Sequence, residues 1–219
     1  MLAEQTCFKN LNSKDYMGRM VRARGEMVYI EGPLSPSELR NLQLDQKLNT
    51  FRQPKEQLKA LVEIAELEKG RIYGARVNDM LVGYVTFHPP DGYERWGQAK
   101  LTNLIELGAI EISPNWRGAG LGNALLELMV SQGWLEKNIL FATEYYWHWD
   151  LEATGLSVWQ YRNMMEKLFR KTGMEPASTD DPEICCHAAN MLMVRIGQKV
   201  TQQEIEEFDK VRMQGFALI

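Results

Sequence analysis

Cysteine is scarce in this sequence. Only three of the 219 residues are cysteines, and their positions suit neither a metal site nor a disulfide framework. Cys185 and Cys186 are adjacent and Cys7 is remote from both, so no metal-ligand spacing occurs and one thiol is left over. The adjacent pair is either redox-active or a pair of small apolar core residues, and we expect the second. These features are typical of a reducing compartment, so we expect a cytoplasmic protein without a bound metal.

Long apolar runs and an excess of positive charge are also missing. No stretch approaches the ~20 apolar residues that cross a membrane, and no apolar signal-peptide core is visible, so we expect no membrane partner. The net charge is −4 and no Lys/Arg run occurs, which excludes a general attraction to nucleic acid. A hydrophobic content of 45% and a charged content of 25% are typical of one soluble globular domain with appendages.

The stretch from Ile110 to Gly122, I-E-I-S-P-N-W-R-G-A-G-L-G, carries the clearest functional signal. The apolar run Leu104 to Ile112 predicts a buried strand that ends at Ser113-Pro114. A glycine-rich turn follows, and apolar residues then recur at helical spacing: Leu121, Ala124, Leu125, Leu128 and Met129. Such a strand, turn and helix start form a cradle for an anion, because the first helical N–H groups lack intrahelical partners and glycine admits a phosphate closely. The alternative is a turn that merely joins strand and helix.

Two familiar phosphate-binding motifs fit this cradle poorly. A P-loop requires Gly-Lys-Ser/Thr at the helix start, whereas Asn123 follows Gly122 here. A dinucleotide fingerprint requires G-x-G-x-x-G, but the glycines lie at positions 118, 120 and 122. The pattern instead resembles the acyl-CoA loop of the GNAT superfamily of N-acetyltransferases, Arg/Gln-x-x-Gly-x-Gly/Ala. Arg117, Gly120 and Gly122 match it, and so does the upstream I-x-I-x-P-x-x-R-G.

This resemblance implies a fold and a co-substrate. The fold is α/β (α+β), with a mixed, mostly antiparallel central sheet whose fourth and fifth strands splay apart, flanked by helices. The co-substrate is acetyl-CoA. The backbone of Ile110, Glu111 and Ile112 would pair with the pantetheine amides, and one of these N–H groups would stabilise the oxyanion. The pyrophosphate would bind the N–H groups of the turn and helix start: Arg117, Gly118, Ala119, Gly120, Leu121, Gly122 and Asn123.

The remaining pattern agrees with that order of elements. Residues 1–25 are polar without a clear period, and are either a poorly ordered extension or a first strand. Further strands are predicted at 26–32, 71–77, 81–87, 139–150 and 191–196. Further helices are predicted to begin at Ser35-Pro36 and Gln53-Pro54, to run through Tyr161–Leu168, and to span Thr201–Met213. We expect an extension at 1–25, an acetyltransferase domain at 26–198, and a C-terminal helix and tail at 199–219.

Two further segments are candidates for binding. His88 to Lys100 is too rich in Pro and Gly for regular structure, and is either a binding loop or an inert excursion. In the strand predicted over residues 139–150, alternation places four polar side chains on one face: Glu144, Tyr146, His148 and Asp150. That face is either catalytic, or binds the amine, or is simply polar. Metal binding by His148 is not expected, because no further ligand spacing supports it.

A closer resemblance covers about residues 27–210. The segments Y-I-E-G-P-L-S-P, V-G-Y-V-T, L-I-E-L-G-A-I-E, T-E-Y-Y-W-H-W-D and N-M-L-M-V-R-I-G resemble the acetoin-utilisation acetyltransferases of Gram-positive bacteria. The resemblance implies a protein acceptor, acetyl-CoA synthetase, which is switched off when one of its lysines is acetylated. Two alternatives stay open: an acetyltransferase for a small-molecule amine, and a non-catalytic acetyl-CoA sensor.

A base is expected beside the thioester. A lysine amine has a pKa of ~10.4, so presenting it as the free amine at neutral pH costs roughly 4–5 kcal/mol. Glu106 is the first candidate, since the resemblance places it at the catalytic glutamate of the histone-acetylating branch. Glu144 is the second candidate. Glu111 is five residues from Glu106, so its side chain lies on the other face of the strand unless a bulge intervenes. Phe169 replaces a tyrosine that protonates the thiolate in many members. Its substitute is left open, and the candidates are Tyr145, Tyr146, Tyr161 or water.

Overall fold

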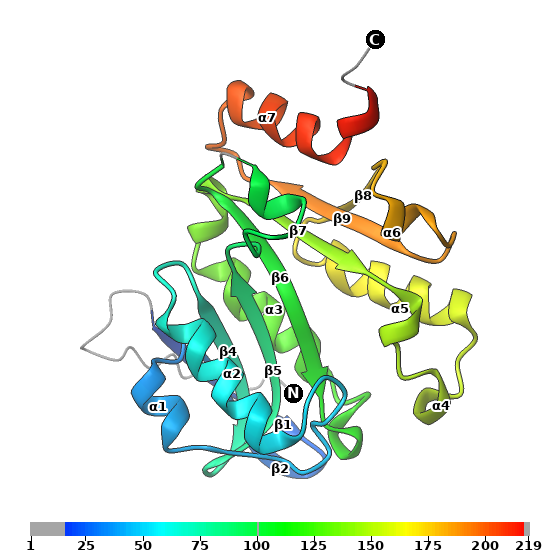
Figure 1. Ribbon diagram of the computed structural model, residues 1–219. Helices are drawn as coiled ribbons and strands as arrows, with labels where there is room; N and C mark the ends of the chain where they lie inside the picture. Colours follow the sequence, from blue (N-terminus) through cyan, green and yellow to red (C-terminus); the bar gives the residue numbers. More distant parts are fainter. Residues whose placement is uncertain (1–15, 100, 217–219) are drawn as a thin grey trace. The chain divides into compact units, whose positions relative to one another are not determined.

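The computed structural model describes residues 16–99 and 101–216, and Figure 1 labels its helices and strands. The described chain divides into two compact units. Unit 1 contains the described residues up to His88 together with Leu107–Gly133, and unit 2 contains Pro89–Glu106 together with the described residues from Trp134 onward. Strand β6, Leu104–Ile112, contributes residues to both units and has the predicted bounds. The predicted domain boundaries after residues 25 and 198 stay predictions.

Unit 1 is built on strands in the order β1-β2-β4-β5-β6. Their bounds are Met17–Ala23 for β1, Glu26–Gly32 for β2, Arg71–Val77 for β4 and Met80–His88 for β5. Neighbours from β1 to β5 are antiparallel, and the short β3, Gln43–Leu44, pairs parallel to β5. The predicted strand at 26–32 and the hairpin of 71–77 with 81–87 are confirmed. Of the alternatives for residues 1–25, a strand is found over Met17–Ala23, while residues 1–15 and Cys7 lie outside the described residues.

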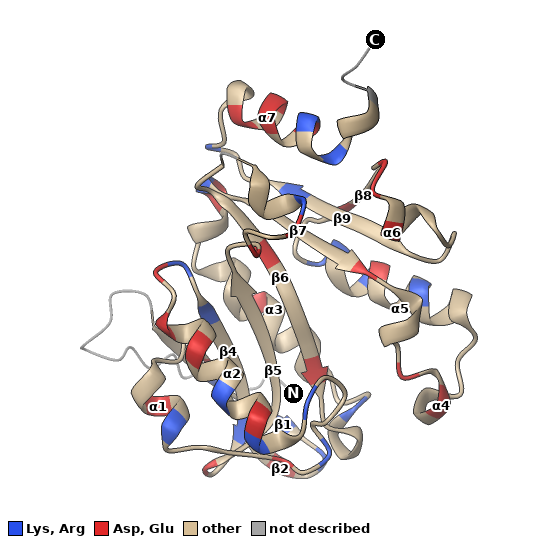
Figure 2. Cartoon of the chain, in the orientation of Figure 1, with Lys and Arg blue, Asp and Glu red and all other residues tan. Residues whose placement is uncertain are grey.

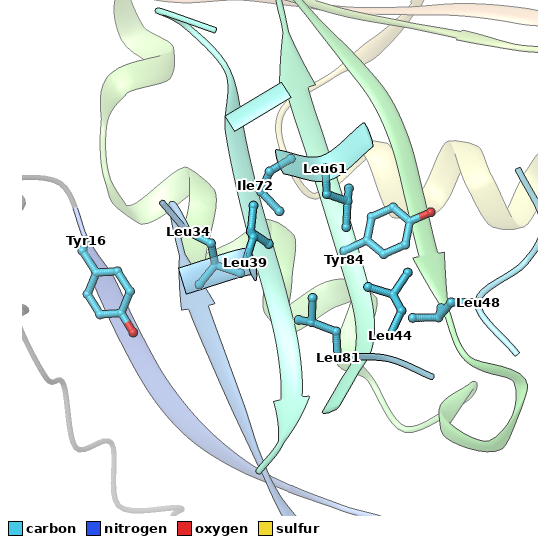
Figure 3. Close-up of a cluster of buried hydrophobic side chains, with 9 residues drawn as sticks. All are labelled: Tyr16, Leu34, Leu39, Leu44, Leu48, Leu61, Ile72, Leu81 and Tyr84. Atoms are coloured by element: carbon cyan, nitrogen blue, oxygen red, sulfur yellow. The ribbon is translucent and has the colours of Figure 1, made fainter. Parts of the chain in front are cut away.

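Three helices accompany these strands: α1 at Pro36–Arg40, α2 at Pro54–Glu66 and α3 at Leu121–Ser131. Ser35 caps α1 in a reciprocal capping box with Glu38, as its sequence predicts. The core holds side chains from α1, α2, β4 and β5, among them Leu39, Leu61, Ile72, Leu81 and Tyr84 (Figure 3). In that view the hydroxyl of Tyr84 points toward β6. Ala109 of β6 packs against this core, so the core supports the second half of β6.

Unit 2 is built on strands in the order β6-β7-β9-β8. Their bounds are Ile139–Glu144 for β7, Glu175–Ala177 for β8 and Met191–Ile196 for β9. The antiparallel pairing of β7 with β9 covers all of β7, whereas the parallel pairing of β6 with β7 covers only Leu104–Glu106 and Ile139–Phe141. Its helices are α4 at Leu151–Thr154, α5 at Val158–Arg170, α6 at Pro182–Cys185 and α7 at Gln202–Arg212. The predicted mixed, mostly antiparallel sheet flanked by helices is confirmed.

The strand predicted over Ile139 to Asp150 is wrong beyond Glu144. Glu144 pairs with Met191, the first residue of β9, so the ladder has no partner strand beyond that point. Tyr146–His148 form a 3-10 turn, and the Asp150 carboxylate accepts the Ala153 N–H at 3.2 Å as the N-cap of α4. Glu144, Tyr146, His148 and Asp150 therefore do not share one strand face, and the alternation of polar and aromatic residues belongs to a turn.

The loop between β5 and β6 is anchored within unit 2. Trp96 belongs to the short 3-10 helix Trp96–Gln98. The centroid of its ring lies 5.0 Å from that of Phe141 and 6.2 Å from that of Phe208. Arg95 donates to the Val211 carbonyl at 2.6 Å and pairs with Asp180. The expectation that this loop has no regular structure is therefore wrong over Trp96–Gln98. Burial of the indole against two aromatic rings holds this part of the loop against the core.

Candidate active site

The glycine-rich turn of unit 1 has the geometry of an anion cradle. After β6 ends at Ile112, a 3-10 turn covers Pro114–Trp116 and α3 begins at Leu121. Gly118 and Gly120 have φ values of 73° and 81°, in the left-handed region that favours glycine. A Cβ placed on Gly120 would meet no atom of the described residues within 4 Å, so these residues leave the space in front of the helix start open. The first N–H groups of α3 have no intrahelical acceptor and present a positive potential to that space.

Cationic side chains from three segments surround this turn. Arg24, in the β1–β2 turn, donates from Nη2 to the Arg117 carbonyl, and Lys47 Nζ donates to Asn115 Oδ1 at 2.9 Å. The Arg117 side chain folds back, with Nε donating to the Ile112 carbonyl at 3.1 Å. Figure 2 shows basic positions around this end of β6. The arrangement suits a ligand with several phosphates.

Sequence reasoning missed Arg24 and Lys47. Both lie far from the glycine turn in the sequence, and only the pairing of β1 with β2 brings Arg24 to it. The sequence does contain a pattern that predicts a turn at Arg24, because Arg24-Gly25 lies between two runs of strand-forming residues, as in a tight hairpin. Arg24 itself has a φ of 52°, an unusual conformation for a residue other than glycine.

The Glu111 side chain is held in the core of unit 1. It is 5% exposed, and its carboxylate accepts the Tyr84 hydroxyl at 2.6 Å and the Thr50 N–H at 3.0 Å. Burial, and then the negative charge of Glu111, raise the pKa of Tyr84. Glu111 therefore links β6 to β5 and to the loop before α2. Its side chain lies on the opposite face of β6 from that of Glu106, because the two residues are five positions apart.

Glu106 lies on β6 directly opposite Phe141 and is partly buried. Burial, with smaller contributions from the negative charges of Glu94 and Asp91, raises the pKa of Glu106 from 4.5 to about 7. Asp91 and Glu94 belong to the loop that Trp96 anchors. A carboxyl group with this pKa exchanges protons near neutral pH, as a general base must.

Glu144, at the end of β7, lies on the opposite face of the sheet from Glu106. Directly paired residues share a face, and Glu144 is three residues beyond Phe141, the partner of Glu106. The Glu144 carboxylate accepts the Trp149 Nε1–H at 2.6 Å, and burial raises its pKa from 4.5 to about 7. The two carboxylates therefore do not form a pair. Each is a separate candidate.

The tyrosines near the end of β7 occupy different environments. Burial raises the pKa of Tyr145 to about 12, and its ring stacks on Trp147 with centroids 4.9 Å apart. Tyr146 donates its backbone N–H to Asn190 Oδ1 at 3.0 Å. Phe169 is fully buried in α5. None of these contacts selects the group that protonates the thiolate.

The raised pKa values predict how stability depends on pH. Both carboxyl groups hold their protons to a higher pH in the folded chain than in the unfolded chain, so their contribution to stability is present below pH 4.5 and is lost as pH rises through 7. Glu106→Gln and Glu144→Gln should each raise the free energy of unfolding at pH 8 by about 3 kcal/mol, and hardly change it at pH 4. Urea unfolding at both pH values measures this. Glu63→Gln, at an exposed position of α2, is the control, and a loss of stability at pH 8 in both variants would contradict the assignment.

Within the described residues, no helix is long and apolar enough to cross a membrane. The described part of the chain also contains no group of three or more His, Cys, Asp or Glu side chains that could hold a metal ion.

Comparisons with known proteins agree with this geometry. Residues 37–148 match the acetyltransferase (GNAT) family. The acetoin utilization protein AcuA of Bacillus licheniformis is 47% identical over 199 residues, and that of Bacillus subtilis is 45% identical. In both comparisons the match covers 91% of this chain and 95% of the relative.

Solved structures support the same assignment. The crystal structure of an acetoin utilization protein from Exiguobacterium sibiricum has a TM-score of 0.91 at 44% identity, covering 95% of this chain and 99% of the other. The GNAT domain of S. lividans PAT, at 12% identity and a TM-score of 0.50, covers 81% of this chain and 96% of its own, and supports the fold alone. The chain therefore belongs to the GNAT family of acetyltransferases, in the group of the acetoin utilization proteins.

Proposed function

We propose that this protein transfers the acetyl group of acetyl-CoA to a lysine side chain of acetyl-CoA synthetase and thereby inactivates the synthetase. Membership in the GNAT family supports the reaction, and the names of the AcuA relatives support a role in acetoin utilisation. The observation that carries the choice of a lysine acceptor is the acidic surrounding of Glu106, to which Asp91 and Glu94 contribute. A lysine enters as a cation, and negative charges favour its approach.

The cradle supplies the proposed site for acetyl-CoA. The pyrophosphate binds the N–H groups of the turn and helix start, where Gly118 and Gly120 leave the backbone accessible. The thioester arm runs along β6, where the backbone of Ile110, Glu111 and Ile112 pairs with the pantetheine amides. One of these N–H groups stabilises the negative charge that develops on the thioester oxygen.

The carboxylate of Glu106 acts as the base, directly or through one water. It accepts a proton from the lysine ammonium, the free amine nitrogen forms a bond to the thioester carbon, and the carbon–sulfur bond breaks. The nitrogen loses its second proton as the amide forms, and the departing thiolate takes up that proton directly or through water. Because the pKa of Glu106 is raised to about 7, both protonation states of the carboxyl group are populated near neutral pH. The raised pKa also makes Glu106 a stronger base than an exposed carboxylate.

Arg24 is expected to strengthen acetyl-CoA binding. Its guanidinium lies against the cradle at the Arg117 carbonyl, so Arg24→Ala should weaken binding about fivefold, by roughly 1 kcal/mol. Arg22→Ala, at an exposed position of the neighbouring strand β1, should bind as the parent does. Calorimetry with acetyl-CoA and with dephospho-CoA measures both variants, and a loss seen only with acetyl-CoA assigns Arg24 to the 3′-phosphate. Equal affinities of the Arg24 and Arg22 variants for acetyl-CoA would show that Arg24 does not contact this ligand.

The alternative acceptor, a small amine, would need an enclosed acidic pocket around Glu144 and Asp150. Asp150 instead caps α4, and the Glu144 carboxylate is bound to Trp149. We therefore expect polyamines to be much poorer substrates than acetyl-CoA synthetase. Release of free CoA thiol, followed with each acceptor in turn, measures the difference. Fast turnover of polyamines with an unmodified synthetase would favour the small-amine enzyme, and no turnover with any acceptor would favour a non-catalytic acetyl-CoA sensor.

A further inference from the structure

Aromatic side chains form a continuous surface within unit 2. They come from the turn after β7, the first turn of α5 and the segment before β9: Tyr145, Tyr146, Trp147, His148, Trp159 and His187. We call this set the aromatic surface. The ring of Tyr146 contacts those of Trp147 and His187, with centroid distances of 5.4 Å and 4.2 Å. The ring of Trp159 follows at 6.4 Å from that of His187, so rings from three segments adjoin one another.

Both tryptophans of the aromatic surface are exposed to solvent. The exposed fraction is 47% for Trp147 and 55% for Trp159. The segment before His187 also lies at the surface, because Cys185 and Cys186 are exposed free thiols, which corrects the expectation that they fill the core. Single exposed apolar residues are ordinary, whereas adjoining exposed rings mark a place where another molecule binds.

The rings are held in place before any partner arrives. Trp147 stacks on Tyr145 with centroids 4.9 Å apart, and the ring of His148 meets Trp147 nearly edge-on at 5.9 Å. The Tyr146 N–H donates to Oδ1 of the buried Asn190 at 3.0 Å. A surface fixed in this way loses little conformational freedom on binding, which favours affinity.

The aromatic surface begins on the face of the sheet that carries Glu106. Phe141 lies directly opposite Glu106, and Tyr145 is four residues further along the same extended chain, so alternation keeps it on that face. Tyr145 also packs against the core cluster that contains Trp96 and Phe141. Four extended residues span about 13 Å. A protein whose lysine reaches Glu106 therefore extends over the aromatic surface.

Negative charges lie beside the start of the aromatic surface. Burial is the largest cause of the raised pKa of Tyr145, and the charges of Asp181, Glu183 and Glu94 add to it. Arg95 offsets part of the Asp181 charge at 3.8 Å, and Glu183 adds an exposed carboxylate. This potential favours a partner that is basic around its target lysine. An exposed indole ring also attracts cations.

We propose that the aromatic surface is the docking site for the acceptor protein, and that a Lys or Arg side chain of the acceptor packs against Trp147 while the target lysine reaches Glu106. The inference rests on the proposed function and adds the surface that selects the acceptor. Tryptophan and tyrosine are prominent among the residues that carry most of the binding energy of protein interfaces. A small amine at Glu106 does not extend to Trp147, so docking favours a folded protein over a free amine.

Substitution of the two tryptophans tests the docking site. Trp147→Ala should raise the KM for acetyl-CoA synthetase at least about tenfold, and Trp159→Ala at least about threefold. The kcat and the KM for acetyl-CoA should stay within about twofold of the parent, because neither ring touches the reacting atoms. Trp147→Phe, which keeps an aromatic ring, should recover most of the loss. Leu67→Ala is the control, since Leu67 follows α2 in unit 1 and is also 47% exposed.

Charge reversal tests whether the partner is basic. Glu183→Lys should raise the KM for the synthetase at least about threefold at low salt, and the effect should shrink at high salt as the charges are screened. Glu63→Lys, at an exposed position of α2, changes the net charge equally and should leave this KM unchanged. An equal effect of the two substitutions would contradict a basic partner beside Tyr145.

Steady-state rates with varied synthetase and saturating acetyl-CoA distinguish the outcomes. Acetylation by the parent with an unchanged KM for the synthetase in both tryptophan→alanine variants would overturn the docking site and leave the proposed function intact. A parent that neither binds nor acetylates the synthetase would contradict both. Size-exclusion chromatography covers the remaining occupant. A parental dimer that Trp147→Ala dissociates, with a parental KM for the synthetase, would assign the surface to a second copy of this chain and overturn the proposal.

Discussion

Replacing Glu106 with glutamine should lower kcat about 10²–10⁴-fold, the usual contribution of general-base catalysis. The amide keeps the size of the side chain but cannot accept a proton from the lysine ammonium. Because Glu106 has a pKa of about 7, the parent enzyme should lose kcat as pH falls below 7, and the variant should lack this acidic limb. Steady-state rates between pH 5 and pH 9 measure both effects.

Glu144→Gln is the matched control for this experiment. Glu144 also has a pKa of about 7, but it lies on the opposite face of the sheet and is bound to Trp149. Its variant should keep the acidic limb and most of kcat. In the Glu106 variant, acetyl-CoA affinity should hardly change, because the cradle N–H groups are intact. A parental kcat and pH profile in the Glu106 variant would make Glu106 structural and turn attention to Glu144.

Replacing Gly120 with aspartate should weaken acetyl-CoA binding at least about a hundredfold. Two causes act together. Gly120 has a φ of 81°, which strains a residue with a side chain, and the new carboxylate would enter the open space in front of the α3 N-terminus. The negative charge would repel the pyrophosphate in the cradle. Calorimetry with acetyl-CoA measures the loss.

Gly133→Asp is the control for backbone strain in that experiment. Gly133 also has a left-handed φ, 72°, and open space around its Cβ direction, but it follows the other end of α3. It should therefore share the strain without placing a charge in the cradle, and should bind acetyl-CoA as the parent does. Tight binding by the Gly120 variant would place the pyrophosphate elsewhere.

The parts of the fold that were predictable are those in which a local pattern decides the structure. The apolar run before Ser113-Pro114 predicted the bounds of β6. The N-cap Ser35, followed by a proline and an acidic first turn, predicted the start of α1, and Thr201 with Glu204 predicted the start of α7. The glycine turn was also predictable. A left-handed backbone before a helix demands glycine, so the requirement is visible in the residue type.

The parts that were not predictable depend on distant segments. Alternation continues past Glu144, but the strand stops there because β9 offers no partner beyond Met191. Arg24 reaches the cradle only through the pairing of β1 with β2. Residue type could not show that Cys185 would be exposed, since a small apolar residue at the end of a short helix can lie on either side.

The most direct test of the central claim is the intact mass of purified acetyl-CoA synthetase after incubation with this protein and acetyl-CoA. Acetyl transfer to one lysine predicts a mass increase of a single acetyl group, together with loss of synthetase activity, and almost no change with the Glu106→Gln variant. Peptide mass spectrometry then locates the lysine. An unmodified, fully active synthetase after incubation with enzyme that binds acetyl-CoA would contradict the account.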